Sequence, residues 1–265
     1  MFDRLKNSNS ILLACIDVDK LKRQIDISQM ASTLSETEHV RANAFRDALL
    51  KDRFIAGRFC LRQILGDELN MSSSEISFSI ENNGKPVVSN SPTGGGHFSF
   101  SRSQQYVLIG YSASHRIGVD IERVRSFPDM ELMAAEIFAE HQFLEWQSLP
   151  LAERPLGFFR GWTRKEAAVK VDGRGISDGV RQIDVPLGDM ADQVAKVPLP
   201  HGAPVAQDVA TTVSLTEWQM NDELSTSVAI ESCSVGLPTA FTDASEQRFG
   251  ISYGTAIRRS FCLAH

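Results

Sequence analysis

Hydrophobic and polar residues follow two different periods along this chain. Alternating or nearly continuous apolar runs, typical of strands, occur at residues 10–18, 76–80, 87–88, 98–101, 106–111, 117–122, 183–187, 212–215 and 226–231. Apolar residues at steps of three and four, typical of amphipathic helices, occur at residues 35–65, 130–146 and 156–171. A long excursion is expected over 188–211, and 236–265 has no clear period. The pattern predicts a mixed α/β (α+β) fold.

The strand predicted at residues 117–122 carries two acidic side chains on one face. Ile117, Val119 and Ile121 take one face and anchor the strand. The period of two then places Asp120 and Glu122 together on the other face, roughly 6 to 7 Å apart. Such a pair is often no more than two solvated carboxylates, but it also suits a bound cation.

The helix predicted over 156–171 carries an acidic residue on its apolar stripe. Glu166 shares this stripe with Phe159, Trp162 and Val169, and Gly173 suits a left-handed cap after the helix. Burying a carboxylate is costly unless a partner compensates its charge, and a cation shared with the 117–122 strand would be that partner. With Lys170 one turn later, the alternative is a simple ion pair on the helix surface.

Composition narrows the class of protein and of metal. The 265 residues fit one or two compact units, and the net charge of −6 gives no global attraction for nucleic acid. The apolar stretch 11–16 is too short for a signal peptide or a membrane span, so a cytoplasmic protein is expected. Four cysteines without a CxxC pair and six histidines without HExxH spacing leave carboxylates as the metal ligands. Oxygen ligands favour magnesium, with manganese as the alternative.

Basic residues of the predicted helices could meet a phosphate ligand. Four arginines stand off the apolar stripe within 46–62, and they form either a solvated basic face or an edge that faces phosphate. Lys165, Lys85 and Arg102 are further candidate cations beside the acidic residues, together with Lys170.

Four blocks, in a fixed order, carry a family resemblance. They are Asn83-Gly84-Lys85-Pro86, then Phe98-Ser99-Phe100-Ser101-Arg102-Ser103, then Ile117-Gly118-Val119-Asp120-Ile121-Glu122, and then residues 158–175, FFRGWTRKEAAVKVDGRG. The chain resembles the 4'-phosphopantetheinyl transferase superfamily, and most of all its surfactin-synthetase-activating (Sfp-type) branch. The likeness runs from about residue 38 to residue 231.

The resemblance implies an architecture of two similar α/β halves in a pseudo-twofold arrangement, with the active site in the cleft between them. Residues 1–116 would form the N-terminal half, with the basic helix and coenzyme A contacts, and 117–235 the C-terminal half, with the magnesium site. Residues 236–265 would be a tail of unknown role. The family also suggests a monomer.

The resemblance also implies roles for individual residues. Three acidic positions would hold magnesium: Asp120, Glu122 and Glu166. Five positions match family residues of the coenzyme A site: Arg46, Arg53, Lys85, Ser101 and Lys170. Lys165 and Arg102, as further cations, bring the positions expected to contact coenzyme A to seven. Lys85 would lie near the 3'-phosphate, and Arg46 is a looser match than Arg53. Many family members have histidine where this chain has Arg102, and arginine keeps its charge and cannot act as a base near neutral pH.

The implied activity is transfer of the phosphopantetheine arm of coenzyme A to a serine of an apo acyl or peptidyl carrier protein, with release of 3',5'-ADP. Magnesium would bridge the diphosphate with help from Asp120. Because Arg102 cannot take a proton near neutral pH, Glu166 is the expected base, acting directly or through a metal-bound water, and Lys170 would stabilise the departing phosphate. Such a holo-carrier synthase serves fatty acid, polyketide or nonribosomal peptide synthesis, and the sequence does not indicate which.

Two other functions fit parts of the same pattern. An acidic pair followed by Glu-x-x-x-Lys also suits a magnesium-dependent nuclease, but the acidic net charge and the lack of interleaved basic and aromatic residues argue against it. A catalytically silent homologue that binds coenzyme A or a carrier protein is the second alternative, motivated by Arg102. No membrane partner and no nucleic acid are expected.

Overall fold

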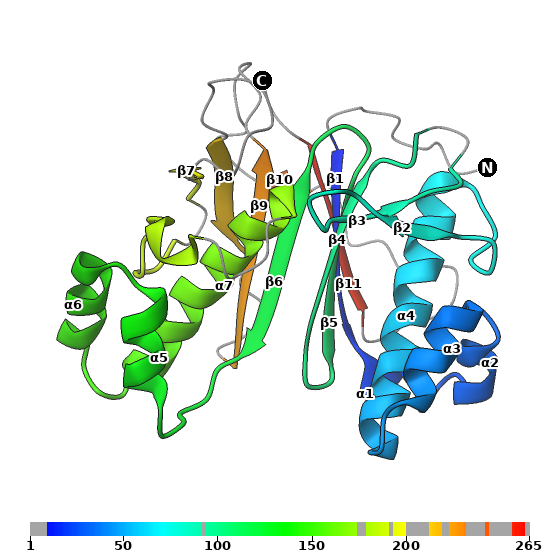
Figure 1. The fold of residues 1–265 in the computed structure, drawn as a ribbon, viewed down its shortest axis with the longest axis horizontal. Helices are drawn as coiled ribbons and strands as arrows, with labels where there is room; N and C mark the ends of the chain where they lie inside the picture. Colours follow the sequence, from blue (N-terminus) through cyan, green and yellow to red (C-terminus); the bar gives the residue numbers. More distant parts are fainter. Residues whose placement is uncertain are drawn as a thin grey trace.

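The computed structural model describes residues 10–91, 94–173, 179–190, 193–199, 212–218, 223–231, 242–243 and 256–262. The fold is mixed α/β, with two main antiparallel sheets, a small two-stranded sheet, and helices on both outer sides (Figure 1). None of the described helices is long and apolar enough to cross a membrane.

The larger sheet has the strand order β10-β11-β1-β5-β4, and the smaller has the order β6-β9-β8-β7. A separate two-stranded sheet joins β2 and β3. The strands are β1 (Ser10–Asp17), β2 (Phe78–Ile80), β3 (Pro86–Val88), β4 (His97–Ser103), β5 (Tyr106–Ser112), β6 (Ile117–Arg123), β7 (Ala195–Pro198), β8 (Thr212–Glu217), β9 (Leu224–Glu231), β10 (Thr242–Asp243) and β11 (Ala256–Cys262). The helices are α1 (Val18–Leu21), α2 (Ile27–Ala31), α3 (Glu36–Asn43), α4 (Ala48–Leu69), α5 (Met130–Ile137), α6 (Glu140–Ser148) and α7 (Arg154–Asp172).

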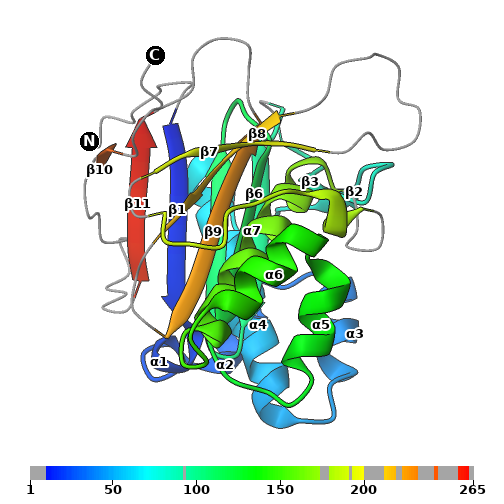
Figure 2. The same ribbon diagram turned by 90° about the vertical axis from the view of Figure 1, so that its left-hand side faces the viewer.

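Strand β1 separates two hydrophobic cores by its period of two. Leu12 and Ile16 pack with α4 in one core, whereas Ile11 and Leu13 pack with apolar residues of β6 and β9 in the other. The layers therefore run from α4 through the two sheets to α7, as the two views show (Figures 1 and 2).

A row of serine hydroxyls joins β4 to β6, which are not neighbours in a hydrogen-bonded ladder. Ser99 Oγ accepts a hydrogen bond from the backbone N–H of Val119 at 3.0 Å. Ser101 and Ser103 do the same for residues 121 and 123, at 3.4 and 3.0 Å. These three residues, here called the serine seam, take the place of carbonyl acceptors where one sheet meets the other.

Most of the predicted elements up to residue 173 are confirmed, with shifted ends. The 35–65 prediction corresponds to two helices, α3 and α4, and the 130–146 prediction also divides into two, α5 and α6. Gly173 follows α7 with φ of 84°, which confirms the predicted left-handed cap.

The strand predicted at residues 183–187 is wrong. The alternation of apolar and polar residues does reflect burial, because Ile183, Val185 and Leu187 are buried. Within the described residues, however, the segment pairs with no strand, and its carbonyl groups accept hydrogen bonds from helix side chains instead. Lys165 donates to the carbonyls of Val180 and Ile183, Gln142 to that of Val185, and Arg164 to that of Pro186.

Two segments without a clear pattern contribute strands. Within the excursion expected over 188–211, β7 pairs with β8, while 191–192 and 200–211 lie outside the described residues. Within the expected tail 236–265, β11 runs antiparallel to β1, with Ala256 opposite Ile16. Part of that tail therefore extends the larger sheet.

The contact between β6 and α7 depends on a glycine. A Cβ on Gly118 would overlap the carbonyl oxygen of Ala167 and lie 2.9 Å from the nitrogen of Val171. We expect Gly118→Ala to lower the free energy of unfolding by about 1–3 kcal/mol or more, because the helix must move away from the strand. Urea unfolding followed by circular dichroism measures this change.

Gly188→Ala is the matched control, since a Cβ there would meet no atom within 4 Å. It should change stability little. Equal unfolding free energies for the two variants would contradict the close packing of β6 on α7.

Candidate active site

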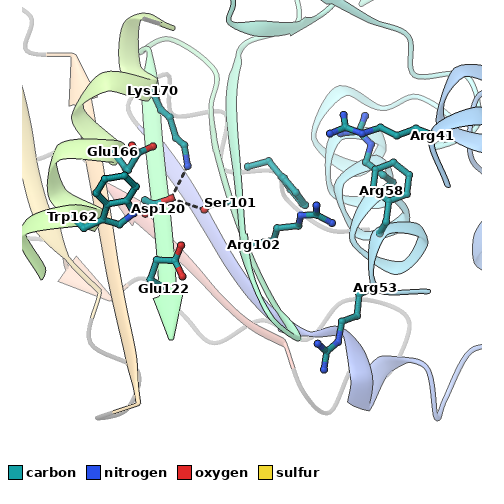
Figure 3. Close-up of a pocket in the computed structure, with 12 residues that line it drawn as sticks. Arg41, Arg53, Arg58, Ser101, Arg102, Asp120, Glu122, Trp162, Glu166 and Lys170 are labelled. Carbon is teal, nitrogen blue, oxygen red and sulfur yellow. Dashed lines mark hydrogen bonds and ion pairs between the residues drawn. The ribbon is translucent and has the colours of Figure 1, made fainter. Parts of the chain in front are cut away.

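Three acidic side chains gather where α7 lies on β6. Asp120 and Glu122 project from β6 on the side that faces α7, and Glu166 projects from α7 toward them (Figure 3). Asp120 and Glu166 are only 4% and 6% exposed. The period of two on the strand and the close approach at Gly118 together account for this arrangement.

Hydrogen bonds hold two of these carboxylates from the side of β4. The Ser101 hydroxyl donates to Oδ1 of Asp120 at 2.6 Å, and the Ser103 hydroxyl donates to Oε2 of Glu122 at 2.6 Å. Each of these hydroxyls also accepts a backbone N–H of β6, so its own hydrogen is directed at the acid. Lys170 Nζ lies 2.6 Å from the same Oδ1 of Asp120.

Negative charge in this cluster is incompletely compensated. Oδ2 of Asp120 and Oε1 of Glu166 are buried and have no hydrogen-bond partner within the part of the chain that the structure describes. Burial raises the pKa of Asp120. Burial, followed by the charge of Asp120, raises the pKa of Glu166 to about 7. Burial is also the main reason why the pKa of Glu122 is raised.

Carboxylate oxygens that have lone pairs not used in hydrogen bonds suit a divalent cation. As they stand, no three histidine, cysteine or acidic side chains among the described residues lie close enough together to form a ready-made metal site. Glu122 is turned to Ser103 and lies 4.0 Å from Arg125. The two unpartnered oxygens on Asp120 and Glu166 are the feature of the cluster that fits a cation.

A pocket of about 400 Å³ separates the acidic cluster from a basic wall. Its acidic side also includes Trp162 and Lys170. The basic wall, seen opposite in Figure 3, consists of Arg41, Arg53, Arg58 and Arg102.

Two arginines of the basic wall are paired with acids. Arg53 Nη2 lies 2.5 Å from Oδ2 of Asp19, and Arg58 forms an ion pair with Glu38. Glu38 also pairs with Arg62, which is fully buried and so belongs neither to a solvated face nor to the pocket.

The other two arginines of the wall have no ion pair with an acid among the described residues. The Arg41 guanidinium lies 5.5 Å from the centre of the Phe54 ring, and that of Arg102 lies 5.9 Å from the centre of the Phe45 ring. Burial and the neighbouring Arg41 lower the pKa of Arg102. The uncompensated positive charge of the pocket therefore belongs to Arg41 and Arg102, and it favours an anionic ligand.

Four of the seven positions expected to contact coenzyme A line this pocket, and three do not. Arg46 is exposed in the bend between α3 and α4. Lys85 is buried, and its ammonium group donates to backbone carbonyls of β6 and α7. Lys165 is buried against the 180–183 segment, and burial lowers its pKa to about 8. The four that line the pocket are Arg53, Ser101, Arg102 and Lys170.

The sequence did not single out every side chain of the pocket. Arg58 is one of the four arginines within 46–62 that stand off the apolar stripe, but no pattern in the sequence predicted that Arg58 or Arg41 binds a ligand. These two residues come from different helices, so no spacing could indicate that they meet. Trp162 lies on the predicted apolar stripe. Its position one turn before Glu166 was the signal in the sequence that it could line the same pocket.

The comparisons with known proteins agree on one family. Residues 116–220 match the family model of the 4'-phosphopantetheinyl transferase superfamily. The chain is 34% identical over 181 residues to the 4'-phosphopantetheinyl transferase HetI of Nostoc sp., covering 68% of this chain and 75% of that protein. It is 25% identical over 162 residues to the 4'-phosphopantetheinyl transferase Sfp of Bacillus subtilis, covering 61% and 70%.

The raised pKa of Glu166 predicts a dependence of stability on pH. The pKa of about 7 in the folded protein lies above the ordinary value of 4.5, so the folded state binds this proton more tightly. The resulting stabilisation is lost as the pH rises through about 7. Without divalent metal, Glu166→Gln should therefore be more stable than the wild type at pH 8, by on the order of 3 kcal/mol, and the difference should narrow at pH 5.

Chemical unfolding at both pH values, in the presence of EDTA, measures this effect. Glu145→Gln, on the exposed side of α6, is the matched control. A difference for Glu166→Gln that is the same at pH 5 and pH 8 would contradict a buried, destabilised carboxylate.

Proposed function

We propose, from the premise that this chain belongs to the 4'-phosphopantetheinyl transferase superfamily, that its pocket moves the phosphopantetheine arm of coenzyme A to a serine of an apo carrier protein. Phosphopantetheinyl transferase activity follows from the family and from relatives at 25–34% identity. The observation that carries the assignment to this pocket is the buried acidic cluster facing a wall of arginines.

We assign magnesium to Asp120, Glu122 and Glu166, with manganese as the alternative. The unpartnered oxygens of Asp120 and Glu166 support this assignment, and Glu122 could join after a change of side-chain rotamer. When bound, the ion would neutralise the charge of the coenzyme A diphosphate. Magnesium prefers to share its coordination shell with phosphate oxygens, which fits a cluster open to the pocket.

The same geometry supports a role for each reacting group. The serine oxygen of the carrier attacks the β-phosphorus of coenzyme A, and the phosphorus–oxygen bond to 3',5'-ADP breaks. Glu166 accepts the serine proton, directly or through a metal-bound water, from its place in the lining of the pocket. Lys170, held beside Asp120, donates to the departing phosphate and stabilises its charge.

The basic wall would bind the phosphates of the nucleotide end. Arg41 and Arg102 are the first candidates, because neither is paired with an acid over the ranges that the structure describes. Arg53 and Ser101 complete the set on this side of the pocket. Arg102 stands where many relatives have histidine, and its guanidinium can hold a phosphate with two hydrogen bonds but cannot take a proton.

The acceptor would be an apo acyl or peptidyl carrier protein. We further infer the two-halved, pseudo-twofold arrangement, with residues 1–116 supplying the basic wall and 117–235 the acidic cluster. Both walls come from one chain, so a monomer would contain the complete site.

The intact mass of the carrier protein tests the function. Incubation with coenzyme A, magnesium and an apo carrier should add one phosphopantetheine, and EDTA should prevent the addition. Glu166→Ala should lower the transfer rate at least about 100-fold, since both a metal ligand and the base are lost. Glu145→Ala, on the exposed side of α6, is the control and should transfer normally.

Three outcomes would contradict these assignments. Near-normal turnover by Glu166→Ala would remove Glu166 from the mechanism. Coenzyme A binding without transfer to any of several carriers would indicate a silent homologue. Magnesium-dependent cleavage of DNA would favour the nuclease.

A further inference from the structure

The turn between β2 and β3 is packed against the C-terminal end of α7. The amide nitrogen of the Asn83 side chain donates to the carbonyl of Asp172 at 2.5 Å. Gly84 and Gly173 both have positive φ, 91° and 84°, and they lie where the two segments meet. A Cβ on Gly173 would lie 2.7 Å from the Cβ of Lys85, so the glycine permits this close approach.

Lys85 is buried at this contact, with 2% of its surface exposed. Its ammonium group donates to the carbonyl of Ile117 at 2.8 Å and to the carbonyl of Lys170 at 2.5 Å. Ile117 begins β6, and Lys170 lies in the last turn of α7, where carbonyl groups lack partners within the helix. A cation at this end also complements the helix dipole.

The two elements that Lys85 joins carry the whole acidic cluster. Asp120 lies three residues after Ile117 on β6, and the side chain of Lys170 reaches Asp120 while its carbonyl is bound to Lys85. One buried ammonium group thus fixes the helix end to the strand beside the reacting groups. To bind a phosphate in the pocket, it would have to leave both carbonyls without a donor.

We propose that Lys85 is a positioning residue, which holds Lys170 against Asp120 by joining the start of β6 to the last turn of α7. The proposal rests on the proposed function of the pocket. It also replaces the contact with the 3'-phosphate of coenzyme A that the family resemblance implies for Lys85. Asn83 assists from the same turn by binding the carbonyl of Asp172.

Steady-state kinetics with two donors test the proposal. Lys85→Met keeps an unbranched side chain, one atom shorter than lysine, and removes the ammonium group. We expect kcat to fall about 10- to 100-fold, as for other groups that orient a catalytic residue, with KM for coenzyme A within about twofold of the wild type. The loss should be the same with 3'-dephospho-coenzyme A as donor, because no contact with the 3'-phosphate is involved.

Two further variants separate positioning from loss of folding. Lys196→Met, at an exposed lysine of β7, is the matched control and should behave as the wild type. Asn83→Ala leaves Lys85 in place and should lower kcat in the same way by a smaller factor. Melting temperatures show whether each variant is folded under the assay conditions.

The proposal is overturned if Lys85→Met raises KM for coenzyme A at unchanged kcat, or if its defect disappears with the dephospho donor. Either result would indicate that Lys85 binds a phosphate of coenzyme A. Hydrogen exchange gives a readout that needs no transfer: peptides from 117–122 and 165–173 should lose protection in Lys85→Met but not in Lys196→Met. Unchanged protection would also overturn the proposal, whereas a wild type without any transfer would contradict the proposed function instead.

Discussion

The serine seam between β4 and β6 is the interaction on which the arrangement of the site depends. β4 and β6 belong to different sheets and share no backbone ladder, so the hydroxyls of Ser99, Ser101 and Ser103 supply the acceptors for the N–H groups of β6. Two of the same hydroxyls donate to Asp120 and Glu122. The contact that joins the two sheets is therefore also the contact that orients the acidic side chains.

The opposite charges of the two pocket walls explain why the protein tolerates a costly cluster. Buried carboxylates are destabilising when they are unpaired, and Asp120 and Glu166 each keep one oxygen without a hydrogen-bond partner among the described residues. Arg41 and Arg102 carry positive charge and form no ion pair with an acid in the part of the chain that the structure describes. A divalent cation would neutralise the acidic cluster, and a ligand with several phosphates would neutralise the arginines. This combination is typical of sites for phosphoryl transfer.

The local periods in the sequence were enough to predict the acidic wall. The period of two placed Asp120 and Glu122 on one face, and the helical period placed Glu166 inward; both features are set by short segments. The basic wall was only partly predictable, because Arg41 and Arg58 meet through the packing of two helices. Lysines were the least predictable residues, since a long flexible stem can reach backbone carbonyls as easily as a ligand.

The same limit explains the errors in the fold. Residues 183–187 have the alternation of a strand, but side chains from α6 and α7 bind their carbonyls in place of a neighbouring strand. The pairing of β11 with β1 joins the two ends of the chain, and no local pattern in 256–262 indicated that partner. Pairing over such a distance depends on the whole fold and leaves little trace in a short window of sequence.

Binding of manganese, followed by electron paramagnetic resonance, tests the central claim most directly. The account predicts that the wild-type protein binds one Mn²⁺, that coenzyme A increases the affinity, and that Asp120→Asn abolishes the binding while the protein stays folded. Equal binding of Mn²⁺ by the wild type and Asp120→Asn, with or without coenzyme A, would contradict the assignment of the acidic cluster as the metal site.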